Sequence, residues 1–95
     1  MTKLVRDGKI AVLISPGFGS GWFEEARFDA EIVRMLEMDV STEDIKSYCK
    51  IMYPGQYLGG LYYLEVEWVT EGEYFYIHEY DGSEWIVNQG DMHVA

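Results

Sequence analysis

The stretch that most constrains the fold is residues 9–22, KIAVLISPGFGSGW. Its apolar run at residues 10–15 contains several β-branched side chains, which favours a strand that is covered on both faces. Pro16 cannot donate to a strand ladder, and the glycines that follow free the backbone. The stretch therefore predicts one buried strand that leads into a stiff turn and a glycine-rich loop.

The length of 95 residues and a hydrophobic content of 48% predict a single folded domain over residues 1–95. Cys49 is the only cysteine, so an internal disulfide and a Cys-pair metal site are both excluded. No apolar run approaches the ~20 residues that cross a bilayer, and the N-terminus has no cleavage-site pattern. We therefore expect a soluble protein of the reducing cytoplasm, with no membrane partner.

Residues 29–38 and 41–53 predict two short helices. Asp29 and Ser41 are suitable N-caps, and Pro54 with Gly55 ends the second helix. Apolar residues recur at helical spacing on one side of each segment. The predicted inward stripes are Ile32, Val33 and Leu36 in the first helix, and Ile45, Tyr48, Cys49 and Met52 in the second.

The last third of the chain predicts three strands, at residues 61–70, 73–80 and 83–88, because polar and apolar residues alternate there. Glu71-Gly72 and Asp81-Gly82 separate them as two-residue turns. The predicted fold is α+β, with an N-terminal strand, two short helices and a C-terminal three-stranded antiparallel meander whose one face the helices cover. The register then places core residues opposite one another: Val66, Ile77 and Ile86 in one row, Trp68 and Phe75 in another, with Leu64 above them.

The same register predicts the outer face of the meander. Glu65, His78 and Trp85 form one row, and Glu67 lies beside Tyr76 in the next. This predicts a surface on which carboxylates and aromatic rings alternate.

The acidic charge is concentrated in the second half of the chain. Residues 1–50 contain nine acidic and all seven basic residues, whereas residues 51–95 contain eight acidic residues and no Lys or Arg. Such a field repels phosphate backbones and attracts basic proteins, so direct nucleic-acid binding is disfavoured. The simpler interpretation, that the charge only keeps a small protein soluble, stays open.

These patterns favour a non-enzymatic interaction protein that binds, and through binding inhibits, a basic partner such as a nucleic-acid-binding protein. Tyr and Trp are enriched where interfaces gain most of their energy. An alternative is that the rings are only the covered second face of a sheet. The predicted contact residues are Glu65, Glu67, Tyr76, His78 and Trp85.

Catalytic chemistry has little support in the sequence. His78 opposite Glu65 resembles half of an acid-base pair, but no nucleophile, orienting group or oxyanion donor accompanies it. No His, Cys or Asp spacing matches a metal site, no cofactor motif is present, and Cys49 lies on the buried stripe of a helix. We predict no catalytic residue, no metal and no cofactor.

The glycine loop offers a second functional hypothesis, a site for a small ligand such as a nucleotide. Its G-x-G-x-G spacing matches neither the dinucleotide fingerprint nor a P-loop, and no helix begins directly after it. The structural alternative is that the glycines let the rings fold back onto the core. The candidate ligand-binding residues are Gly17, Phe18, Gly19, Ser20, Gly21 and Trp22.

The stretches RDGKIAVLISPGFGSGW and LEVEWVTEGEYFYIHEYDGSE together resemble small bacteriophage and prophage proteins without an assigned activity. The resemblance covers the outer thirds of the chain and leaves the helical middle unmatched. It implies a viral context, in which small acidic proteins often bind and block host machinery. It assigns no residue a role.

Overall fold

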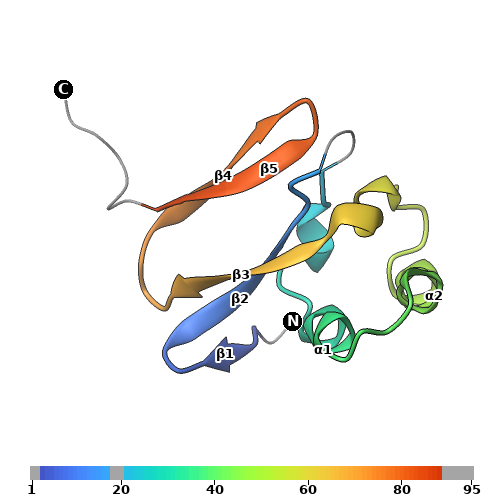
Figure 1. The fold of residues 1–95 in the computed structure, drawn as a ribbon, viewed down its shortest axis with the longest axis horizontal. Helices are drawn as coiled ribbons and strands as arrows, with labels where there is room; N and C mark the ends of the chain where they lie inside the picture. Colours follow the sequence, from blue (N-terminus) through green and yellow to red (C-terminus); the bar gives the residue numbers. More distant parts are fainter. Residues whose placement is uncertain (1–2, 18–20, 89–95) are drawn as a thin grey trace.

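The fold is α+β, as the sequence predicts, with two α-helices, a three-stranded antiparallel sheet and a separate two-stranded hairpin (Figure 1). We describe it from a computed structural model, in which residues 3–17 and 21–88 are placed. The elements in chain order are β1 (Val5–Arg6), β2 (Lys9–Ile14), the 3₁₀ helix η1 (Glu24–Ala26), α1 (Ala30–Glu37), α2 (Thr42–Met52), the 3₁₀ helix η2 (Gly59–Tyr63), β3 (Glu65–Thr70), β4 (Phe75–Tyr80) and β5 (Ser83–Asn88).

β2 is the central strand, and both of its faces are covered. On one face Ala11 and Leu13 pack into a cluster that includes buried residues of both helices. On the other face Val12 and Ile14 pack with Val69. The unbroken apolar run therefore predicted its environment correctly, since a strand with one wet face would alternate.

The two helices begin and end close to their predicted bounds. The Asp29 carboxylate accepts hydrogen bonds from the amides of Glu31 and Ile32, and the Ser41 hydroxyl accepts one from the amide of Asp44. The predicted inward residues Ile32, Val33, Ile45 and Cys49 are buried. Met52 was wrongly assigned to the stripe: it is the last residue of α2 and is 55% exposed, because Tyr53, the residue that follows it, packs against the cluster instead.

β4 and β5 form the hairpin that Asp81-Gly82 predicted. Asp81 and Gly82 have φ values of 50° and 82°, the left-handed pair that a two-residue hairpin turn requires. Ile77 lies opposite Ile86, and His78 lies opposite Trp85, as the predicted register had them.

The predicted meander is wrong in one pairing, because β3 pairs with β2 and not with β4. The register runs from Lys9 opposite Thr70 to Ile14 opposite Glu65, so the predicted pairs of Val66 with Ile77 and of Trp68 with Phe75 do not form. Alternation identifies the face of a strand but not its neighbour. A strand buried on both faces must pair its own backbone groups, and β3 supplies that partner to β2.

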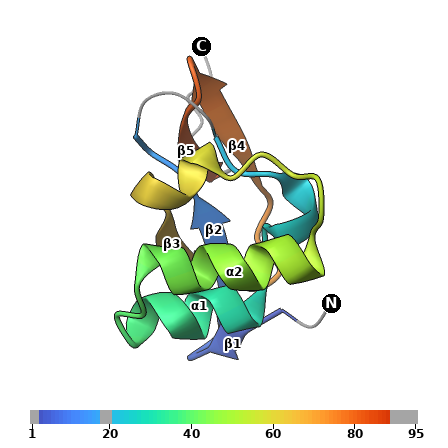
Figure 2. The same cartoon turned by 90° about the vertical axis from the view of Figure 1, so that its right-hand side faces the viewer.

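The hairpin instead packs across the sheet as a separate layer, on the side opposite the helices (Figures 1 and 2). Phe75, Ile77 and Ile86 pack against the cluster of Val12, Ile14 and Val69. Leu64, Val66 and Trp68 belong to the other cluster, on the helix side of the sheet. The predicted core residues are therefore buried or half-buried, but they are divided between the two faces of the sheet.

Candidate interaction site

A buried ion pair fastens the hairpin to the rest of the domain. Arg27, which follows η1, donates from Nη1 to Glu84 Oε1 at 2.9 Å and from Nη2 to Glu84 Oε2 at 3.0 Å. Arg27 is 3% exposed and Glu84 is 4% exposed. Burial lowers the pKa of Arg27, but its hydrogen bonds to Glu84 and Glu24 outweigh that effect and raise it. The guanidinium therefore stays charged and holds β5 in place.

Backbone contacts at the end of β2 complete this junction. The amide of Ser15 donates to Glu84 Oε1 at 2.8 Å, and the amide of Glu84 donates to the carbonyl of Ser15 at 3.0 Å. The Ser83 hydroxyl donates to the carbonyl of Pro16 at 2.6 Å. The first residues of β5 thus have fixed positions relative to β2, and the hairpin is a rigid platform.

The outer face of the hairpin presents a row of aromatic side chains. The ring centroids of His78 and Trp85 lie 4.6 Å apart, and those of Tyr76 and His78 lie 6.4 Å apart. Tyr76 is 47% exposed and Trp85 is 43% exposed, and Tyr80 continues the face with 69% exposure. We call Tyr76, His78 and Trp85 the ring row. Three of the five predicted contact residues are therefore adjacent and accessible.

The other two predicted contact residues do not belong to this face. Glu65 and Glu67 lie on β3, opposite Ile14 and Val12, so they share the side of the three-stranded sheet on which the hairpin packs. The ring row lies on the far side of the hairpin, away from that sheet. The predicted rows of Glu65 with His78 and Trp85, and of Glu67 with Tyr76, are wrong because they depended on a β3–β4 pairing that does not form.

Acidic groups border the ring row instead of alternating with its rings. Exposed Glu79 and Asp81 lie at the tip of the hairpin, where Glu79 Oε1 accepts a hydrogen bond from the amide of Gly82. Exposed Glu71 and Glu73 lie before the start of β4. Carboxylates therefore lie near both ends of the hairpin, beyond the rings, and Glu79, which is opposite Glu84, is on the Ile77 side of the hairpin and not on the side of the ring row.

The described part of the glycine loop has a structural explanation. A Cβ on Gly17 would lie 2.2 Å from the ring of Tyr63, and a Cβ on Gly60 would lie 1.9 Å from the carbonyl oxygen of Gly21. Trp22 is 5% exposed and its indole N–H donates to the carbonyl of Ala26 at 3.3 Å, so its ring belongs to the core. The candidate ligand residues Phe18, Gly19 and Ser20 lie outside the described residues.

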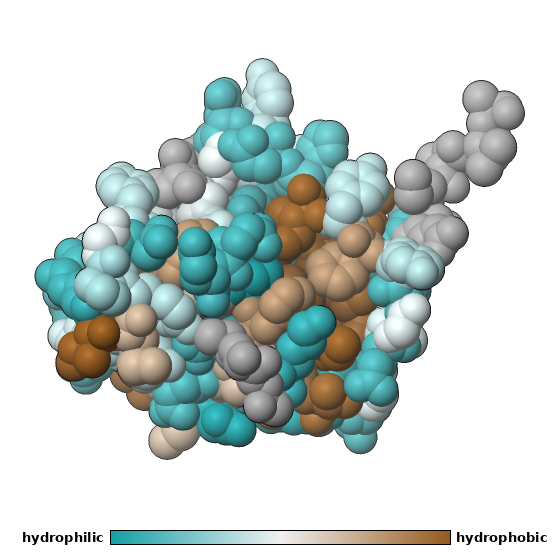
Figure 3. All heavy atoms as spheres, turned by 180° about the vertical axis from the view of Figure 1, so that it is seen from behind, coloured by the Kyte–Doolittle hydropathy of each residue, from teal (hydrophilic) through white to brown (hydrophobic). Residues whose placement is uncertain are grey.

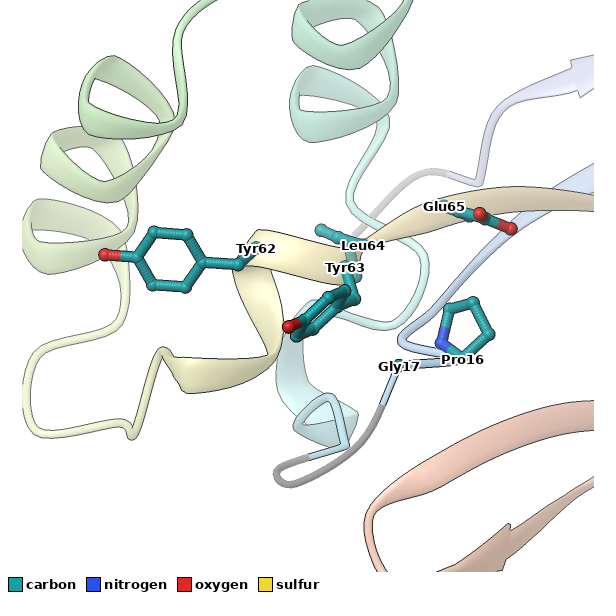
Figure 4. A pocket seen from close by; sticks show the side chains of 6 residues that line it. All are labelled: Pro16, Gly17, Tyr62, Tyr63, Leu64 and Glu65. Atoms are coloured by element: carbon teal, nitrogen blue, oxygen red, sulfur yellow. The ribbon is translucent and has the colours of Figure 1, made fainter.

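A surface hollow of about 410 Å³ lies beside this loop (Figure 4). Pro16 and Gly17 line it together with Tyr62, Tyr63, Leu64 and Glu65. The rings of Tyr62 and Tyr63 point to different sides of the backbone. Of the predicted ligand residues that the structure describes, only Gly17 lines the hollow.

A second buried polar cluster surrounds Asp29. Its Oδ2 accepts hydrogen bonds from the hydroxyls of Tyr48 and Tyr53, at 2.9 and 2.5 Å. Burial, and then these hydrogen bonds, raise the pKa of both tyrosines. Burial also raises the pKa of the Cys49 thiol to about 11, so it is not an activated nucleophile. The cluster joins α2 to the start of α1 and has a structural role.

Sequence reasoning missed Arg27 and Glu84. Glu84 lies two residues before Ile86 and therefore shares its inward face, so a charged residue at a core position was a usable signal. Arg27 gave no such signal, because its partner is 57 residues away in the chain.

Within residues 3–17 and 21–88, no His, Cys, Asp and Glu side chains gather in a group of three or more that could hold a metal ion. None of the helices in these residues has the length and apolar character needed to cross a membrane. Comparison of the chain with protein-family models, curated proteins and solved structures found no match.

Proposed function

We propose that the chain is a non-enzymatic interaction protein that binds a basic protein partner through the outer face of the β4–β5 hairpin. The observation that most supports this is the ring row: Tyr76, His78 and Trp85 are neighbours on an exposed face. Large exposed aromatic patches are uncommon on small proteins unless they are used.

The chemistry of the face favours a cationic partner. Aromatic faces attract Lys and Arg side chains, and Arg is a common partner of Tyr and Trp at interface hot spots. The half of the chain that contains the hairpin has no Lys or Arg to repel such a partner. Carboxylates at both ends of the hairpin would steer basic groups toward the rings.

A basic groove that normally binds nucleic acid is the partner surface that best complements this face. Such grooves use cations for phosphates and accept flat rings for bases. Occupation of the groove by the hairpin would exclude nucleic acid, so the protein would act as an inhibitor. The resemblance to bacteriophage proteins also favours a partner that is a protein of the host cell.

A photo-crosslinking experiment tests the proposal. A photoreactive phenylalanine replaces Tyr80, which is 69% exposed beside the ring row, and in a matched variant it replaces Ile51, which is 80% exposed on α2, on the helix side of the sheet. In an extract of the cells that make the protein, the variant with the photoreactive group at position 80 should crosslink to a basic protein at low salt. The crosslinked product should disappear at high salt. Equal crosslinking from both positions, or crosslinking that salt does not change, would reject the proposal.

A small-ligand site is the second candidate, and the hollow beside Gly17 favours it. The exposed rings of Tyr62 and Tyr63, rather than that of Trp22, would contact the ligand. Thermal melting in the presence of a nucleotide and metabolite panel tests it, because a ligand bound only by the folded state raises the melting temperature. A panel without any shift would leave the protein partner as the single proposal.

A further inference from the structure

β3 has a free edge. The strand order of the sheet is β1-β2-β3, and within the described residues β2 is the one strand that pairs with β3 (Figure 1). An edge strand presents unpaired N–H and C=O groups, which can accept a strand from another chain.

The hydrogen-bond pattern identifies which backbone groups face this edge. The amide of Leu13 donates to the carbonyl of Arg27 at 2.9 Å, so the backbone groups of Leu13 point away from β3. In an antiparallel pair the bonded positions alternate, so Val12 makes the bonds to β3, where its partner is Glu67. The residues on either side of Glu67 therefore turn their N–H and C=O groups to the free edge: Val66 and Trp68.

The side chains of β3 make the two sides of this edge chemically different. Glu65 and Glu67 are exposed on the hairpin side, and Glu65 also lines the hollow beside Pro16. On the helix side, half-buried Val66 borders a second hollow of about 390 Å³, which Leu36 and Leu64 line together with the acidic residues Glu37 and Glu65. A strand added to the edge would place its side chains alternately beside Glu65 and Glu67 on the hairpin side and beside Val66 on the helix side.

The acidic side has no basic partner of its own. Among residues 3–17 and 21–88, neither Glu65 nor Glu67 forms an ion pair with a Lys or Arg. Two residues apart on a strand, their carboxylates lie about 7 Å from each other along it. Cations at alternate positions of an extended peptide have the same spacing, whereas residues two apart in a helix do not face the same way.

The same charges disfavour a second copy of the chain as the occupant. If two β3 strands paired antiparallel, Glu65 would face Glu67, or Glu67 would face its own copy, depending on the register. Like charges directly opposite each other destabilise a sheet. Opposite charges at these positions stabilise it, so the edge fits a basic strand.

We propose that the free edge of β3 binds an extended peptide segment in which Lys or Arg alternates with apolar residues, and that this segment adds to the sheet as a further strand. Its cations contact Glu65 and Glu67, and its apolar side chains lie against Val66 and Leu36. The site is distinct from the ring row and does not depend on it.

Two blocked peptides of equal composition and charge test the proposal, one with lysine and valine alternating and one with all lysines before all valines. Binding is measured by titration, and hydrogen exchange reports on the amides of Val66 and Trp68. The alternating peptide should bind about tenfold more tightly than the block peptide and should slow exchange at both amides. Equal affinity for the two peptides, or unchanged exchange, would overturn the proposal.

Charge-matched variants separate this edge from the overall acidity. The double variant Glu65→Gln with Glu67→Gln should bind the alternating peptide with about tenfold lower affinity. Glu71→Gln with Glu73→Gln removes the same charge at exposed positions beyond β3 and should leave the affinity nearly unchanged. An equal loss in both double variants would show a general charge effect and reject the site.

Two further outcomes would also reject it. Trp85→Ala alters the ring row and should leave peptide affinity unchanged, so a loss there would place the peptide on the hairpin. Sedimentation of the free protein should show a monomer. A dimer with protected Val66 and Trp68 amides would make a second copy the occupant of the edge.

Discussion

Arg27 and Glu84, 57 residues apart in the chain, form a two-point ion pair at 2.9 and 3.0 Å in the interior of the protein. Arg27 follows η1, and Glu84 lies in the second strand of the hairpin. The hairpin is therefore held by charge as well as by the apolar contacts of Phe75, Ile77 and Ile86.

Glu84→Gln should reduce the free energy of unfolding by about 3–5 kcal/mol, because it leaves the buried Arg27 charge without its main partner. Glu24→Gln is the control, since the Glu24 side chain also bonds Arg27 but is 77% exposed, and it should cost less than about 1 kcal/mol. Urea denaturation measures both. A Glu84→Gln variant as stable as the Glu24→Gln variant would contradict the assigned role.

Asp29→Ala should destabilise the protein more than the loss of a helix cap alone. It removes the cap of α1 and also leaves the hydroxyls of Tyr48 and Tyr53 without their acceptor. Ser41→Ala, which removes only the cap of α2, should cost about 1 kcal/mol, and Asp29→Ala should cost at least about twice as much. If denaturant titrations gave the two variants equal losses in the free energy of unfolding, the hydrogen bonds from the two tyrosines would contribute nothing to stability.

The melting temperature should fall steeply above pH 9. Folding raises the pKa of Cys49 from 9.0 to about 11 and also raises those of Tyr48 and Tyr53 above 10.0. A raised pKa means that the folded state holds the proton more tightly, so this stability is complete below the ordinary pKa and is lost as the pH rises through the folded one. In Cys49→Ala the onset of the fall should move from about pH 9 to about pH 10, which calorimetry at successive pH values would measure. An unchanged onset would contradict the contribution of the thiol.

Gly60→Ala should abolish folding or cost more than about 3 kcal/mol, because the new Cβ would lie 1.9 Å from a backbone oxygen that cannot move aside cheaply. Gly55→Ala is the matched control. Gly55 has open space around it and a φ of +87°, so its replacement should cost only about 1 kcal/mol of backbone strain. Circular dichroism during denaturation compares the two, and a Gly60→Ala variant as stable as the control would contradict the close approach.

Trp85→Ala should weaken binding of the basic partner by about tenfold or more while the fold persists, because exposed aromatic anchors dominate interface energies. Ile51→Ala, at an exposed apolar side chain on α2, should leave binding unchanged. Titration of the crosslinked partner, once purified, measures both affinities. A Trp85→Ala variant that binds as tightly as the wild type would remove the ring row from the interface.

Local sequence signals predicted both helices and the β4–β5 hairpin, but the predicted strand at residues 61–70 was wrong at its start, where residues 61–63 belong to the 3₁₀ helix η2. Asp29 and Ser41 cap the helices that they were expected to cap, and Asp81-Gly82 forms the expected hairpin turn. The partner of β3 could not be predicted in this way. The alternation in residues 65–70 fits pairing with β2 as well as with β4, and the choice depends on a cavity-free core that only the assembled chain defines.

The residues of the candidate site also divide into those that a local signal placed correctly and those that a long-range pairing decided. One two-residue turn fixes the register of Tyr76, His78 and Trp85 on one face, and the sequence identifies that turn. Glu65 and Glu67 were placed with them through a second turn, at residues 71–74, that does not make a tight hairpin. A long-range choice of strand partner therefore decided which predicted contact residues are neighbours.

The contact between Ser15 and Glu84 also bears on how the chain acquires its structure during translation. One apolar face of β2 lacks the cover of Phe75, Ile77 and Ile86 until synthesis has passed β5, which ends at Asn88. The nascent protein must therefore keep Val12 and Ile14 from aggregating until β4 and β5 have been synthesised, and its yield in cells will depend on how fast the hairpin then packs on β2.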